Sequence, residues 1–191
     1  MTKGHDFKNI TLALALDTYT ELFHPDFKNQ ERLGQLLTQV AGRGGRGQFP
    51  GEIYLQTYNS DHPLLEKLVK DNYGSFLQDI SSEREVTLMP PFRHLALIRA
   101  DSTHSDKVII FLKHVRSITN SIQPQNRSIN YIGPLPSMLE KRAGRYRYLF
   151  QIRTKNRSQM HSLLTKLTHQ MGTIKIPSSV RWSVDVDPVE L

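Results

Sequence analysis

An alternation of polar and apolar side chains over residues 145–153, interrupted at Leu149, constrains the fold more than any other feature of the sequence. One set of side chains is apolar and comprises Tyr146, Tyr148, Phe150 and Ile152. The intervening set is polar and comprises Arg145, Arg147, Gln151 and Arg153. Successive side chains of a strand point to opposite faces of a sheet. Residues 180–187 alternate in the same way, so we expect a sheet with one face in the core and one polar face.

Amphipathic helices surround these strands and predict the rest of the domain. Pro90 and Pro91 break the chain before it. The expected elements are, in order, strand 94–100, helix 106–122, strand 129–133, strand 145–154, helix 157–171 and strand 180–186. Both helices carry apolar residues three and four positions apart, which is typical of a buried helical face. The order β-α-β-β-α-β predicts an α+β, ferredoxin-like split sandwich with two helices on one face of a four-stranded sheet.

The first half of the chain has a different pattern. Residues 10–17 are an almost unbroken apolar run that predicts a buried strand, and a leucine-bearing helix follows from about residue 25. A glycine-rich stretch, residues 42–47, leads to a second strand over residues 52–58. From Asp61 we expect one long helix with apolar residues as far as Ile80, which connects this part to the domain that follows.

The net charge of the chain is concentrated at its C-terminal end. There are 25 Lys and Arg residues against 18 Asp and Glu residues, and the whole excess of +7 falls within residues 121–191. A local positive excess favours binding of nucleic acid. The candidate DNA-binding residues are Lys141, Arg142, Arg145 and Arg147, with Arg153 as a secondary candidate. The alternative is that the arginines form ion pairs with Asp185 and Asp187 across the sheet.

The absence of cysteine limits the chemistry that the chain can perform. It excludes disulfides, thiol catalysis and cysteine-ligated metal sites. The eight histidines show no paired spacing, so we expect no metal site. No apolar run is long enough to span a membrane, and we expect a cytoplasmic protein without a membrane partner.

The segment Q-V-A-G-R-G-G-R, residues 39–46, is the candidate catalytic stretch. Arg43 and Arg46 follow a periodic helix and suit the stabilisation of charge on a transferred phosphoryl group. The pattern formed by Gln39, Arg43 and Arg46 resembles motif VI of superfamily-two helicases. The alternative is an RNA-binding RGG segment, although such segments are repetitive and lack a preceding amphipathic helix.

Phrases along the whole chain extend this resemblance. Lys3-Gly4-His5-Asp6-Phe7 before a strand resembles helicase motif V. Other matching phrases are L-T-Q-V-A-G-R from residue 37, P-P-F from residue 90, G-R-Y-R from residue 144 and W-S-V-D-V-D-P from residue 182. Together they resemble the bacterial primosomal replication-restart helicases, the primosomal protein N′ (PriA) family.

The resemblance implies a domain plan and a function. Residues 1–60 would be the end of a RecA-like second helicase lobe, an α/β remnant with motifs V and VI. Residues 61–87 would be a connecting helix, and residues 88–191 a C-terminal domain that binds DNA or a protein partner. The family activity is ATP-dependent 3′→5′ unwinding of DNA at stalled forks and assembly of the primosome. Its implied partners are forked or single-stranded DNA, single-strand-binding protein and primosome proteins.

The resemblance also implies cofactors that this chain only partly supports. ATP and Mg²⁺ would be bound in the parent enzyme, with Gly4 and Asp6 on the ATP side. The phosphate-binding motif G-x-x-x-x-G-K-[ST] and the cysteines of the family's zinc sites do not occur here. We therefore expect a C-terminal fragment that binds DNA but does not hydrolyse ATP. Gly44, where the family usually has alanine, affects how Arg43 and Arg46 are positioned. A stand-alone nucleic-acid-binding module and a protein-interaction domain remain the alternatives.

Overall fold

The computed structural model describes residues 12–24, 26–41, 52–70 and 72–189. The chain divides into two compact units, Met1–Glu83 and Arg84–Leu191, which are described separately below. No helix within the described ranges is both long enough and apolar enough to cross a membrane.

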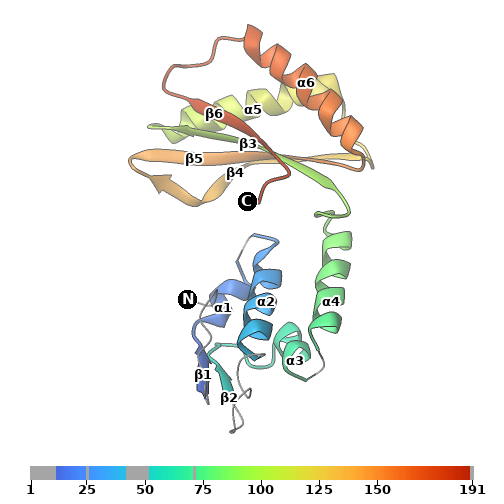
Figure 1. Cartoon of the computed structure of the whole chain (residues 1–191). Helices are drawn as coiled ribbons and strands as arrows, with labels where there is room; N and C mark the ends of the chain where they lie inside the picture. The colour runs from blue at the N-terminus through green and yellow to red at the C-terminus, as the bar shows by residue number, and fades with distance from the viewer. Residues whose placement is uncertain (1–11, 25, 42–51, 71, 190–191) are drawn as a thin grey trace. The chain divides into compact units, whose positions relative to one another are not determined.

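In the described part of the first unit, two parallel strands form the sheet. Its elements are β1 (Leu12–Ala15), α1 (Thr18–Leu22), α2 (Asn29–Ala41), β2 (Glu52–Leu55), α3 (Pro63–Lys70) and α4 (Tyr73–Val86), whose last residues cross into the second unit. β1 and β2 pair in parallel, with Leu12 opposite Glu52 (Figure 1). The helices enclose a small apolar core made of Leu22, Leu33, Leu37, Leu64, Leu65, Phe76 and Ile80.

One prediction for this unit is wrong: the segment after Asp61 forms two helices, not one. α4 begins just after Asn72, whose side-chain oxygen accepts a hydrogen bond from the backbone N–H of Ser75 at 2.9 Å. Asparagine is a favoured residue at a helix N-cap because its side chain satisfies one of the free N–H groups there. The apolar periodicity continues through the break, and for that reason the sequence pattern alone suggests a single helix.

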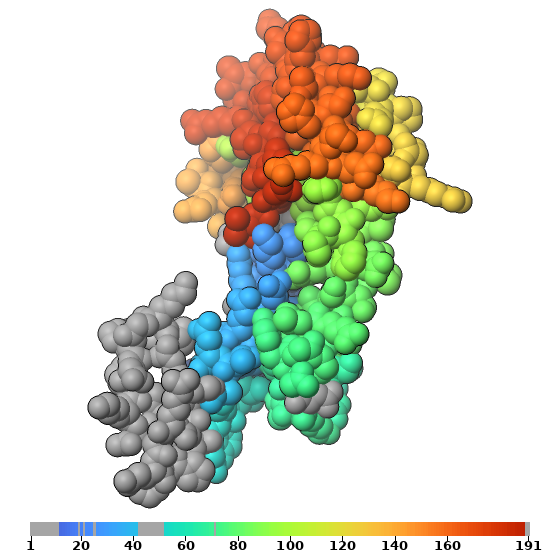
Figure 2. All heavy atoms as spheres, turned by 45° about the vertical axis from the view of Figure 1, so that its right-hand side comes forward, coloured from blue at the N-terminus to red at the C-terminus, as the bar shows by residue number. Residues whose placement is uncertain are grey.

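The second unit has the predicted order β-α-β-β-α-β. Its elements are β3 (His94–Ser102), α5 (Ser105–Ile122), β4 (Ile129–Arg142), β5 (Arg145–Thr154), α6 (Arg157–Thr173) and β6 (Arg181–Val186). The strands form one antiparallel sheet in the order β4-β5-β3-β6. Both helices lie on the same face of this sheet (Figure 1), and α6, in orange to orange-red, is exposed on the side of the unit that Figure 2 shows.

The face of the sheet toward α5 and α6 carries the core, as the alternation predicts. Phe150 and Ile152 are fully buried there, and Tyr148 and Trp182 pack against the cluster. The two helices contribute Val108, Phe111, Leu112, Val115, Met160, Leu163, Leu164, Leu167 and Met171. The predicted helical stripes are therefore core residues.

The opposite face is only partly polar, and here the expectation needs correction. Leu95 and Leu97 of β3 lie on that face by alternation, yet both are fully buried, and Leu149 of β5 is also buried. β3 lies inside the sheet between β5 and β6. The arginines of this face that are described below gather at the end at which β3 finishes and β5 begins, while Gln151 and Arg153 lie beside Leu97 and Leu95 at the other end.

The strand expected over residues 129–133 is also longer than predicted. β4 continues to Arg142, so Lys141 and Arg142 lie in a strand and not in a loop. Pro134 and Pro136 suggest an end to the strand, but β4 is an edge strand and its pairing with β5 shifts register on either side of them. Edge strands and bulges are where proline is tolerated in a sheet.

Candidate nucleic-acid interface

Four arginines gather at the polar end of the sheet face opposite α5 and α6, and we call this surface the arginine face. They are Arg99, Arg145, Arg147 and Arg181, from strands β3, β5 and β6. In the antiparallel register, Asp101 of β3 lies opposite Arg147 on one side and Arg181 on the other. The sheet thereby holds arginines from strands far apart in the sequence within one row.

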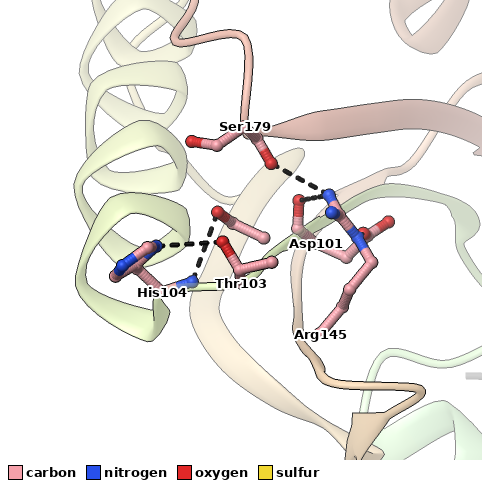
Figure 3. A network of polar contacts seen from close by, with 6 residues as sticks. Asp101, Thr103, His104, Arg145 and Ser179 are labelled. Carbon is pink, nitrogen blue, oxygen red and sulfur yellow. Dashed lines mark hydrogen bonds and ion pairs between the residues drawn. The ribbon is translucent and has the colours of Figure 1, made fainter.

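Two of these arginines are neutralised within the domain. The Arg145 guanidinium forms an ion pair with the Asp101 carboxylate, and it also donates to the backbone carbonyls of Asp101 at 3.1 Å and Ser179 at 2.9 Å (Figure 3). Arg99 pairs with Asp185, with 3.3 Å between the guanidinium nitrogen and the carboxylate oxygen. These two acids are therefore already engaged.

The other two arginines keep their charge unmatched. Within the described ranges, the side chains of Arg147 and Arg181 take part in no ion pair or hydrogen bond. Both line a hollow of about 340 Å³ together with Arg99, Ala100, Asp101, Ser137, Tyr148, Trp182 and Ser183. Two guanidinium groups beside serine hydroxyls form a set of donors suited to phosphate oxygens.

The structure places three of the predicted DNA-binding residues, all on β5, in three different environments. Arg147 is on the arginine face and available. Arg145 is half-buried and forms an ion pair with Asp101. The alternative that the arginines form ion pairs within the sheet therefore holds for Arg145, but its partner is neither Asp185 nor Asp187. Arg153 lies farther along β5 and donates to the Thr87 carbonyl at 2.9 Å and to the Gln151 side chain at 2.8 Å. These two hydrogen bonds give Arg153 a structural role, and its burial lowers the pKa of the guanidinium.

Lys141 and Arg142 lie at the end of the β4–β5 hairpin, and both are exposed. The Lys141 ammonium lies 4.7 Å from the centre of the Tyr146 ring and donates to its hydroxyl at 3.2 Å. The tight turn that joins the strands places Ala143 at φ 49° and Gly144 at φ 73°. Gly144 adopts this positive φ without strain because glycine has no Cβ atom. The turn thus keeps two cations at the tip of the hairpin.

Sequence reasoning did not single out Arg99 and Arg181. Arg181 could have been found, because it occupies the polar set of the alternation over residues 180–187. Its proximity to Arg147 depends on the order β5-β3-β6, which brings residues 34 positions apart onto either side of Asp101. Arg99 follows an apolar run in β3, and no polar–apolar alternation in the sequence marks it as a residue of the polar face.

The residues assigned to ATP by resemblance fall almost wholly outside the described ranges. Gly4, Asp6, Arg43 and Arg46 all lie there, and only Gln39 is described. Gln39 is exposed in the last turn of α2. A single glutamine does not make up a nucleotide site, so no catalytic step is derived from it. Within the described residues no group of three His, Cys, Asp or Glu side chains could hold a metal ion.

The aromatic residues of β5 do not form a platform for stacked bases. RNA-recognition domains of similar sheet order stack bases on exposed aromatic rings of their central strands. Here Phe150 is fully buried and Tyr148 packs on the core side, beneath α5 and α6. This arrangement argues against that mode of binding.

Comparisons with known proteins identify the second unit. Residues 85–189 match the family model described as primosomal protein N C-terminal domain. The chain is similar to replication restart protein PriA of Haemophilus influenzae, with 36% identity over 191 residues, which are 100% of this chain and 26% of that protein. The PriA proteins of Synechocystis and Bacillus subtilis are each 31% identical, over 100% and 98% of this chain.

The chain spans 22–26% of the length of these three relatives. Similarity to solved structures is weak. The de novo designed protein Foldit4 covers 50% of this chain with 14% identity and a TM-score of 0.38, which is too low to support a conclusion.

Proposed function

The chain belongs to the family of the primosomal protein N C-terminal domain, and from this we propose that it forms the C-terminal, DNA-binding part of a replication restart helicase. The observation that carries the proposal is the pair of unmatched arginines, Arg147 and Arg181, at one hollow of the arginine face. Each can hold a phosphate group of the DNA backbone, with Ser137 and Ser183 as further donors. Such contacts read no base sequence, as suits a protein that acts at forks of any sequence.

The first unit supports the same proposal. β1 and β2 are parallel and joined through helices, an arrangement typical of α/β sheets such as those of RecA-like lobes. In the longer protein, Arg43 and Arg46 would face ATP and Mg²⁺ bound by another lobe, with Gln39, Gly4 and Asp6 nearby. By itself the chain would bind DNA without hydrolysing ATP. Single-strand-binding protein and primosome proteins would be its protein partners.

The proposal is tested by the salt dependence of DNA binding. The double variant R147E/R181E of the full chain would be compared with the wild type on a labelled single-stranded oligonucleotide. We expect weaker binding and a slope of log affinity against log salt that is flatter by about 1.4, because each neutralised phosphate on a single strand contributes roughly 0.7.

The matched control is K113E/K166E, which changes the net charge by the same amount. Lys113 and Lys166 are exposed on α5 and α6, on the other side of the sheet. We expect this control to retain most of the wild-type slope of log affinity against log salt. If both double variants lose affinity equally, only the net charge matters. If neither does, the arginine face serves a partner other than DNA, and the proposal fails.

A further inference from the structure

A large bulge interrupts β4 beside the arginine face. Pro136 lies opposite Tyr148 and Lys141 lies opposite Tyr146, so the four residues 137–140 of β4 stand against Arg147 alone. A bulge of this kind leaves residues without strand partners and redirects their side chains. Bulges occur often next to functional sites, because they aim side chains in directions that a regular strand does not allow.

The bulge presents two apolar side chains to solvent. Met138 is 60% exposed and Leu139 is 56% exposed. The residues on either side of this pair are anchored: Ser137 is buried, and the Glu140 carboxylate accepts a hydrogen bond of 2.6 Å from the Tyr148 hydroxyl. The exposure of Met138 and Leu139 is thus fixed by contacts of their neighbours.

Cations surround this apolar pair. Lys141 and Arg142 follow it in β4 after Glu140, whose carboxylate is bonded to the Tyr148 hydroxyl, and Arg147 is the residue that faces the bulge from β5. Ser137, the first bulge residue, lines the same hollow as Arg147 and Arg181. A partner that fits must therefore offer anionic groups next to apolar faces, at a spacing of a few ångströms. Unpaired nucleotides have this chemistry, because each has a phosphate and an exposed base.

We propose that the β4 bulge binds unpaired bases where a DNA duplex opens into single strands. Met138 and Leu139 pack against the faces of the bases, and Lys141 and Arg142 bind the phosphates on either side. Methionine and leucine are among the residues that proteins insert between base steps to unstack them. The inference rests on the proposed DNA binding and adds to it the residues that contact the unpaired bases.

The test compares two DNA molecules of the same sequence, a forked duplex and a fully paired duplex. The fork carries the fluorescent base 2-aminopurine at its first unpaired position. We expect the full wild-type chain to bind the fork more tightly and to change the fluorescence of this base. In the variant M138S/L139S, which keeps every charge, affinity for the fork falls roughly tenfold and the fluorescence change is lost, while affinity for the duplex is unchanged.

The control is Ile110→Ser, which removes an exposed apolar side chain from α5, away from the bulge. We expect it to bind both DNA molecules as the wild type does. If M138S/L139S also binds like the wild type while R147E/R181E is weakened, the exposed pair serves a protein partner and the inference is overturned, although the proposed function stands. If the wild type binds neither DNA, both are overturned.

Discussion

Arg147 lies directly opposite Asp101 across β5 and β3, yet the Asp101 carboxylate pairs with Arg145, two residues away. Arg181 lies opposite the same aspartate from the other side, also without an ion pair within the described ranges. One carboxylate thus stands among three arginines and neutralises one of them. Asp101 therefore controls how much positive charge the arginine face offers to a ligand.

The substitution Asp101→Asn tests whether Asp101 limits the positive charge of the arginine face. The substitution keeps the shape of the side chain, removes one negative charge and releases Arg145 from its ion pair. We expect single-stranded DNA to bind several-fold more tightly at low salt, with a slope against log salt steeper by at most about 0.7. Stability should fall by about 1 kcal/mol, because the ion pair is only partly exposed. Titrations at several salt concentrations and urea unfolding measure the two effects.

Glu85→Gln provides the matched control, because it removes the same charge from an exposed position in α4. We expect it to leave both affinity and slope close to those of the wild type. Equal gains in the two variants would show that net charge, and not the release of Arg145, governs binding.

Local patterns predicted the elements of the second unit well. The alternation over residues 145–153 and the helical stripes are properties of neighbouring residues, and burial on one face follows from them. The break before α4 escaped prediction because Asn72 acts through a capping hydrogen bond inside a continuous apolar pattern. The extension of β4 escaped it because Pro134 and Pro136 are tolerated only through the edge position and register shifts.

The candidate site was harder to predict because it depends on contacts between distant residues. Arg145 and Asp101 are 44 residues apart, and the pairing of β3 with β5 brings them close, although Arg147 is the residue directly opposite Asp101. The sequence named Asp185 and Asp187 as the acids that could neutralise arginines of the polar face, whereas in the structure Asp101 pairs with Arg145 and Asp185 pairs with Arg99. Arg181 joins the site only through the order of strands in the sheet.

The two units should differ in local stability. Leu12, Leu14 and Leu16 are 53%, 62% and 71% exposed in and just after β1, which among the described residues pairs with β2 alone. β3, by contrast, is paired on both sides within a sheet of four strands. We expect amide hydrogens of β1 and β2 to exchange faster than those of β3 and β5. Similar protection of both sheets in the monomeric chain would contradict this expectation.

Gly34→Ala should destabilise the first unit selectively. A Cβ atom at Gly34 in α2 would lie 2.3 Å from the ring of Phe76, which is fully buried. The ring or the helix must move, at a cost of about 1–3 kcal/mol. Gly172→Ala in α6 is the control, because a Cβ atom there meets nothing within 4 Å and alanine favours helix. Hydrogen exchange followed separately in the two units measures the stability change caused by each substitution. Equal effects of the two substitutions would disprove the expected clash.

The stability of the second unit should fall at alkaline pH through Tyr131. This residue is buried in β4 and its hydroxyl donates to the Gln123 carbonyl at 2.8 Å. Burial raises the pKa of Tyr131 from 10.0 to about 12, because the charged phenolate would be poorly solvated. Between pH 10 and about 12 the unfolded chain therefore loses a proton that the folded chain keeps. The free energy of unfolding then falls by about 1.4 kcal/mol per pH unit from this group.

Tyr131→Phe separates this effect from other alkaline titrations. The variant should lose about 1 kcal/mol at neutral pH, because the Gln123 carbonyl loses its donor. Above pH 10 its stability should fall less steeply than that of the wild type, so the two curves of unfolding free energy against pH converge. Urea unfolding at a series of pH values measures the curves, and phenolate absorbance follows the titration itself. Curves that stay parallel up to pH 12 would mean that Tyr131 ionises equally well in the folded and unfolded chains.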